Sequence, residues 1–191
     1  MEFQMKKTIL IALLLAFSAL AQANSEQQMI QQSKQSIKQF ATQLKQKLQQ
    51  GMQAGGPTAA IQVCNTAAAE IAKQVSEQQG WKIARTSLKV RNSHNKADAW
   101  ETTVLNDFEQ RAKQGEAIKD LEFSEIINKQ TKPVFRYMKA IPTQGICLSC
   151  HGDKLAPAIT EKLQQLYPQD QATGFKLGDI RGAFTITRAV D

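Results

Sequence analysis

The chain has 191 residues, of which 42% are hydrophobic and 21% charged, and its formal net charge is +7 at pH 7. A chain of this length makes one ordinary domain with a single core. The 24 Lys and Arg residues are dispersed and are not interleaved with aromatic residues, so we expect no nucleic-acid-binding surface. A basic surface can still steer an acidic partner protein toward the molecule.

The first 23 residues have the three parts of a secretory signal peptide. Lys6 and Lys7 precede an apolar run over residues 9–20, and Ala21-Gln22-Ala23 supplies the small residues of a cleavage site. The apolar run is too short to span a bilayer, and no other long apolar segment follows it. We therefore expect residues 1–23 to be a signal peptide and residues 24–191 to form a single exported domain. An uncleaved signal would instead anchor the protein to the membrane.

Apolar residues that recur at three- and four-residue steps predict four helices. The first is long and amphipathic, and we expect Gly51 and Gly55-Gly56-Pro57 to end it, with Pro57 suited to the first turn of the second. Asp98 is expected to cap the third helix. The predicted helices span residues 24–50, 58–79, 98–113 and 157–167.

Runs of β-branched and large residues predict four strands. The polar residues 128–132 separate two of these runs and indicate an antiparallel hairpin. Strands together with segregated helices predict an α+β fold, in which helices flank an antiparallel sheet. The predicted strands span residues 82–89, 121–127, 134–141 and 180–187.

The segment Cys147-Leu148-Ser149-Cys150-His151 has the C-x-x-C-H spacing that attaches a c-type haem. The two thiols can each add to a haem vinyl group, and the histidine can then bind the iron. A zinc site would need a second ligand pair, and the chain has no second C-x-x-C. A thioredoxin-like dithiol would follow a strand at the start of a helix, whereas residues 142–145 are typical of a turn. We therefore predict one covalent haem c, attached in the periplasm after export.

The second axial ligand of the iron has several candidates. Cys64 is the only cysteine outside the motif, and it is either a buried small hydrophobe or a thiolate ligand. His94 is the other histidine, but its polar neighbours favour an exposed loop. Met138 could bind iron as methionine does in many cytochromes, although its strand pattern favours the core, and Met52 is a weaker candidate.

Nine short segments in order along the chain resemble the small exported monohaem c-type proteins with a PAS-like fold, which are classified as a domain of unknown function. The resemblance implies a central antiparallel sheet and a haem held between His151 and the helix cysteine, here Cys64. Ser93-His94 departs from the family pattern, which keeps His94 as a rival ligand. The nine segments are Ala60-Ile61-Gln62-Val63-Cys64, Arg85-Thr86-Ser87, Arg91-Asn92, Trp100-Glu101, Phe135 to Lys139, Cys147 to Gly152, Tyr167 to Asp170, Ala172 to Gly174, and Gly178 to Ala183.

These features predict a periplasmic redox or ligand sensor, or a low-potential electron-transfer protein, whose redox or signalling partner in the periplasm is unknown. The alternatives are a plain electron carrier and, less favoured, a peroxidase-type enzyme. An enzyme would need an open position on the iron, which ligation by Cys64 removes, so we expect no catalytic activity. The alternative to the α+β fold is the all-helical fold of ordinary small cytochromes c.

Overall fold

The computed structural model describes residues 2–128 and 132–190, with side chains from Ser25 onward. It divides into two compact units, Met1–Gln35 and Ser36–Asp191. The first unit is helical, and within it the Ser33 hydroxyl donates to the Met29 carbonyl at 2.8 Å. The predicted signal peptide lies among residues whose side chains are outside the described part, so it stays a prediction. Among the described residues, no helix has the length and apolar character to cross a membrane.

Helix α1 (Glu2–Gln79) is interrupted at Gly55 and Gly56, where the backbone leaves the helical region. Gly56 has φ 70°, which favours glycine. The prediction of two helices is confirmed, with the break at Gly55-Gly56 as expected, but Gly51 does not end the first helix, because the helix continues to the kink. Gly51 instead lets the two arms approach, since a Cβ on it would lie 2.9 Å from the Ala60 Cα.

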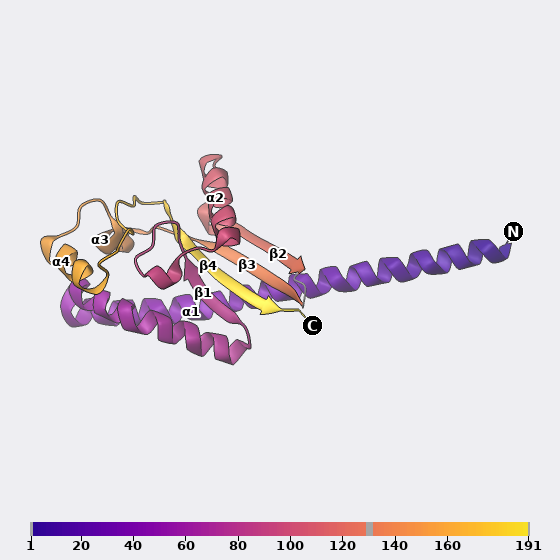
Figure 1. Cartoon of the computed structure of the whole chain (residues 1–191), viewed down its shortest axis with the longest axis horizontal. Coiled ribbons are helices and arrows are strands. Elements are labelled where there is room, and N and C mark those ends of the chain that lie inside the picture. The colour runs from indigo at the N-terminus through magenta and orange to yellow at the C-terminus, as the bar shows by residue number, and fades with distance from the viewer. Residues whose placement is uncertain (1, 129–131, 191) are drawn as a thin grey trace. The chain divides into compact units, whose positions relative to one another are not determined.

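Four antiparallel strands form one sheet in the order β1-β4-β3-β2 (Figure 1). The predicted α+β class and all four strands are therefore confirmed. The two strands of the predicted hairpin pair antiparallel, and residues 129–131 between them lie outside the described residues. Strand β1 ends three residues before the predicted limit. There the chain turns, and the Ser87 amide donates to the Asn95 carbonyl at 3.3 Å. The strands are β1 (Lys82–Thr86), β2 (Glu122–Asn128), β3 (Pro133–Pro142) and β4 (Ile180–Ala189).

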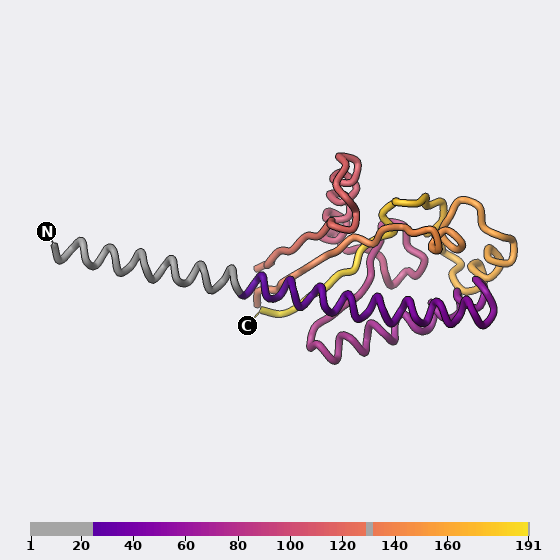
Figure 2. The backbone as a smooth tube through the Cα atoms, turned by 180° about the vertical axis from the view of Figure 1, so that it is seen from behind, coloured from indigo at the N-terminus to yellow at the C-terminus, as the bar shows by residue number. Residues whose placement is uncertain are grey.

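Helix α2 (Ala99–Lys113) covers one face of the sheet, and the arms of α1 within residues 36–79 run along the other face (Figures 1 and 2). Asp98 caps α2 as predicted: its side chain accepts from the Glu101 amide at 2.8 Å, and Glu101 accepts from the Asp98 amide at 3.1 Å. The core under α2 consists of Val104, Leu105, Phe108, Leu121, Met138, Ala140, Ile180 and Ala183.

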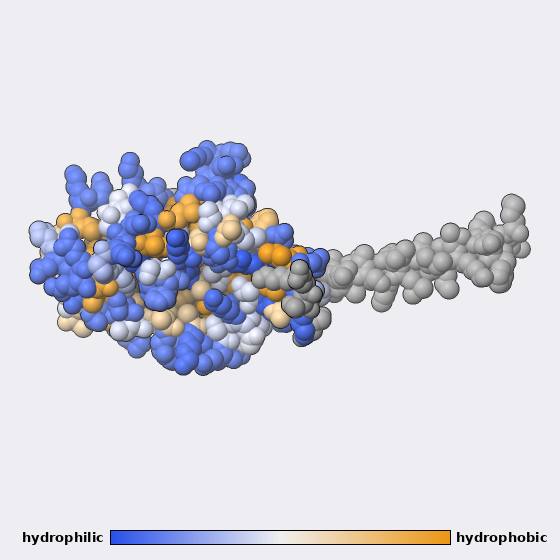
Figure 3. Space-filling view, in the orientation of Figure 1, coloured by the Kyte–Doolittle hydropathy of each residue, from blue (hydrophilic) through white to orange (hydrophobic). Residues whose placement is uncertain are grey.

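Two short helices, α3 (Leu148–His151) and α4 (Pro157–Leu166), lie together at one end of the unit Ser36–Asp191 (Figure 1). Helix α4 packs Ile159 and Leu163 against Ile61 of α1, beside Cys150. The segment that carries the C-x-x-C-H motif is thus held against the second arm of α1. On the face shown in Figure 3, hydrophilic side chains cover most of the described surface of Ser36–Asp191.

Candidate functional site

A cavity of about 620 Å³ lies between the α1 arms, the sheet and the segment that carries α3. Side chains of Phe40, Leu44 and Ile61 give it a mainly apolar wall. Its size falls within the roughly 300–1,000 Å³ of sites that enclose small molecules and cofactors. The cavity is formed by residues of Ser36–Asp191 alone.

The four residues predicted to hold the haem all line this one cavity: Cys64, Cys147, Cys150 and His151. The 3-10 helix Gly145–Cys147 runs directly into α3, so the chain is helical through the motif. Residues three and four positions apart share one side of a helix, which turns both thiols and the imidazole toward the cavity. Cys64 reaches the same cavity from the second arm of α1, one turn beyond Ile61. All three cysteines are free thiols.

The structure places the other candidate ligands differently. Met138 is fully buried at 0% exposure in the core under α2 and is not among the residues that line the cavity in the described part of the chain. His94 lies on the 3-10 helix Ser93–Asn95, is exposed, and borders the cavity, with its Nδ1 3.0 Å from the Asn92 Oδ1. Met52 also lines the cavity. His94 and Met52 therefore remain near the site, whereas Met138 does not.

The His151 ring is held in one orientation by the segment after α4. Its Nδ1 lies 2.7 Å from the Ala172 carbonyl oxygen, to which the Nδ1–H donates, and this leaves the lone pair on Nε2. The Phe175 amide donates to the His151 carbonyl at 2.9 Å, and the two rings meet edge to face at 6.2 Å. Burial, followed by the charges of Arg181 and Arg91, lowers the pKa of His151 to about 2. The imidazole is therefore neutral, which is the form that binds a metal.

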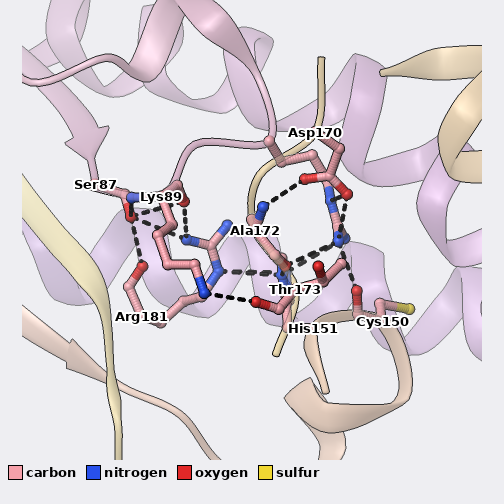
Figure 4. Close-up of polar contacts among 9 residues, drawn as sticks. Ser87, Lys89, Cys150, His151, Asp170, Ala172, Thr173 and Arg181 are labelled. Carbon is pink, nitrogen blue, oxygen red and sulfur yellow. Dashed lines mark hydrogen bonds and ion pairs between the residues drawn. The ribbon is translucent and has the colours of Figure 1, made fainter. Parts of the chain in front are cut away.

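Arg91 and Asp170 form a mostly buried ion pair that ties this segment to α3. The Arg91 Nε and Nη2 each lie 3.0 Å from the Asp170 Oδ2, and the two side chains are 12% and 10% exposed. Arg91 also donates to the Cys150 carbonyl at 2.6 Å and to the Ala172 carbonyl at 3.2 Å, while Asp170 accepts from the Ala172 amide at 2.8 Å (Figure 4). The carbonyl that orients His151 is thus positioned by this pair.

The thiols lie in an environment with two opposing effects. Burial raises the pKa of Cys64, whereas the positive charges of Arg85 and Arg91 lower it. Burial likewise raises the pKa of Cys150, against the charge of Arg91. The apolar wall thus favours the thiol form, and the neighbouring guanidinium groups favour any state in which sulfur is anionic.

The sequence matches the model of the Tll0287-like family over residues 17–188. The chain belongs to the Tll0287-like family. Its structure is similar to a crystal structure described as that of the cyanobacterial heme-protein Tll0287, with a TM-score of 0.58 and 27% sequence identity. That similarity covers 81% of this chain and 93% of the other. Among curated proteins, none is significantly similar to this chain.

Sequence reasoning gave no role to the polar residues around His151 in this Tll0287-like chain. Asp170, Ala172 and Arg181 come from parts of the chain far from the motif, and no local pattern shows that they meet it. Only one feature of the sequence points to a role for them: all three lie in the segments that carry the family resemblance. Arg85 and Arg91 lie in those segments as well. These residues cluster around the cavity in the folded chain.

Proposed function

We propose that this protein binds haem, and that it does so as an exported c-type protein with one haem attached through Cys147 and Cys150. Haem binding is supported by membership of the Tll0287-like family and by similarity to a protein described as a cyanobacterial heme-protein. The covalent attachment is supported by the C-x-x-C-H motif, whose two thiols and histidine line one cavity. Export is supported by the signal-like residues 1–23.

One observation carries this proposal: the second arm of α1 brings Cys64 to the same cavity as Cys147, Cys150 and His151. The residues present fit a haem in three respects. The cavity has the volume and apolar wall of a cofactor site, two free thiols border it, and a neutral histidine presents an unprotonated Nε2. A haem bound there would supply a one-electron redox couple.

His151 and Cys64 are proposed as the two axial ligands. His151 is suited to this role because Ala172 holds its Nδ1–H, which fixes the tautomer and the ring. Cys64 is suited because it lines the same cavity as His151. Burial raises the pKa of its thiol overall, and the positive charges of Arg85 and Arg91 only partly oppose this, so a bound iron would have to favour the thiolate. An anionic sulfur ligand stabilises ferric over ferrous iron, so the reduction potential should be low. His94 and Met52 are the remaining rivals at the cavity. We further propose that the sheet with its flanking helices is the PAS-like fold that the resemblance implies.

Sensing of redox state or of a ligand is the role we favour, with low-potential electron transfer as the second. A thiolate that is released on reduction gives two discrete states of the protein, and a switch needs such a bistable element. With both axial positions held by protein residues, we propose no enzymatic activity. Hydrogen exchange over the second arm of α1, residues 58–79, separates the two roles. Different protection in the ferric and ferrous forms supports sensing, whereas equal protection with fast electron exchange with an acidic periplasmic redox protein supports a plain carrier.

Intact-mass measurement after export and maturation tests the proposal. The wild-type protein should carry one added haem that resists extraction with acid acetone. Cys147→Ala and Cys150→Ala should each leave a single thioether, and the double variant should lose all pigment to the solvent. Cys64→Ala is the matched control, because it removes a thiol from the same cavity but should keep the covalent mass. Complete extraction of pigment from the wild-type protein would contradict covalent attachment.

A further inference from the structure

The cavity carries more positive charge than its protein neighbours balance. Arg85, Arg91 and Arg181 all line it, and its wall is otherwise mainly apolar. Arg91 is paired with Asp170. Within the described residues, neither Arg85 nor Arg181 has a carboxylate within ion-pair distance. Two guanidinium groups therefore face this cavity without a negatively charged partner.

Arg181 is well held, but only by neutral groups. Its Nη1 donates to the Ser87 hydroxyl at 3.2 Å and to the Lys89 carbonyl at 3.3 Å (Figure 4). Its Nε lies 3.2 Å from the His151 Nδ1, which carries the proton donated to Ala172 and so accepts no hydrogen bond from Arg181. Burial, followed by the charges of Arg91 and Arg85, lowers the pKa of Arg181 to about 10, and the more distant charge of Asp170, which is paired with Arg91, only partly opposes this. The three cations thus repel one another, and a buried charge without a counter-charge is costly.

Arg85 is oriented differently, but within the described residues it also lacks a carboxylate partner. Its guanidinium lies 5.7 Å from the centre of the Phe40 ring, and burial lowers its pKa. A contact with an aromatic ring supplies weaker compensation than a carboxylate does. Arg85 lines the cavity but has no anionic partner in the part of the chain that the structure describes. An anionic group of a bound molecule would explain both observations.

Both residues belong to the four-stranded sheet. Arg85 is in β1 and Arg181 is the second residue of β4, and these two strands are hydrogen-bonded neighbours. Gly182 permits the close approach of the two strands, because it has φ 149° and because a Cβ there would clash with the Thr86 carbonyl. Two guanidinium groups are therefore preorganised at one side of the cavity, as sites for carboxylates require.

We propose that Arg85 and Arg181 bind the two carboxylate groups of the tetrapyrrole that occupies this cavity. This inference rests on the proposed function and adds to it that the cavity recognises a dianionic macrocycle. The planar guanidinium matches a carboxylate with two parallel hydrogen bonds, which an ammonium group cannot make. The two arginines then hold the macrocycle independently of the thioether bonds.

Redox titration and redox-difference infrared spectroscopy of the haem-loaded protein test this inference. The haem carries ¹³C in its two propionate carboxyl groups, so that their bands are separated from those of Asp and Glu. The variants are Arg85→Gln, Arg181→Gln and, as a matched control, Arg111→Gln on α2, whose side chain pairs with Glu116 away from the cavity. Removing a cation near the iron favours the ferric state. Each cavity variant should therefore shift the redox equilibrium about tenfold, which lowers the potential by about 59 mV for one electron.

The labelled carboxylate bands should move in both cavity variants and stay fixed in the control. Arg85→Lys and Arg181→Lys should each restore the wild-type reduction potential, because lysine returns the positive charge. Neither should restore the wild-type carboxylate band, because lysine cannot make the two parallel hydrogen bonds. The band shift of Arg85→Gln should persist in a Cys64→Ala background, which shows that Arg85 does not act through the thiol. Labelled bands that match the wild type in both cavity variants would overturn the inference. A wild-type protein without haem would instead refute the proposed function.

Discussion

Replacing Asp170 with Asn removes one charge from the buried pair that positions the His151 loop and changes little in size. In the wild-type protein its carboxylate receives the Arg91 Nε and Nη2 at 3.0 Å each and the Ala172 amide at 2.8 Å. Removing one partner of a buried pair leaves the other charge uncompensated and typically costs about 3–5 kcal/mol. Since Asn keeps the hydrogen bond from Ala172, we expect a loss near the lower end, about 3 kcal/mol.

A loss of about 3 kcal/mol changes the unfolding equilibrium more than 100-fold, because about 1.4 kcal/mol corresponds to a factor of ten. For a chain of this size it lowers the melting temperature by roughly 6–12 °C. The assay is thermal and urea unfolding of Asp170→Asn beside Asp107→Asn. Asp107 pairs with Arg111 at 3.3 Å, but these side chains are 49% and 28% exposed, so the control should lose less than about 1 kcal/mol. Equal losses in the two variants would refute the reasoning that burial makes the Asp170 pair strong.

Two further predictions concern the frame around the site. Gly182→Ala should destabilise the protein by at least about 2 kcal/mol in urea unfolding, because its φ of 149° is unfavourable for alanine and the new Cβ would clash with the Thr86 carbonyl. Gly145→Ala, where a Cβ meets no atom within 4 Å, should unfold like the wild type, and equal losses would contradict this. Burial raises the pKa of Asp98, but hydrogen bonds from the α2 backbone and Arg136 outweigh it, so the pKa lies below its usual 3.8. The depressed pKa means that Asp98 stabilises the fold above pH 3.8 and loses this effect as the pH falls further. Asp98→Asn should therefore lose less stability than the wild type between pH 4 and pH 2. Parallel curves of unfolding free energy against pH for the two proteins would exclude Asp98 as a source of the acid sensitivity.

The sequence predicted the elements of this fold well because their signals are local. Periodicity and the capping residue Asp98 located the helices, and β-branched runs located the strands. The errors occurred where distant segments meet. Gly51 is typical of a helix end, but in the fold its lack of a side chain permits contact with Ala60 in the other arm. Strand β1 ends at Thr86 because Ser87 bonds to Asn95, which its own composition does not show.

The candidate site could be predicted only in part for the same reason. Cys147, Cys150 and His151 are adjacent in the sequence, so their spacing identifies their chemistry. That Cys64 reaches the same cavity depends on the packing of α4 against Ile61, which no local pattern contains. The carbonyl that orients His151 belongs to Ala172, and a backbone group has no sequence signature. Polar partners of this kind become visible only in three dimensions.

Ligation of the iron by Cys64 is the central claim, and one low-temperature EPR measurement tests it most directly. The ferric wild-type protein should give a low-spin spectrum with narrowly spread g values, which is typical of a thiolate ligand. Cys64→Ala should convert it to a high-spin spectrum or to that of another ligand set, with the thioether-bound haem retained. Widely spread g values in the wild type, or a spectrum that Cys64→Ala leaves unchanged, would contradict the claim and assign the position to His94 or Met52.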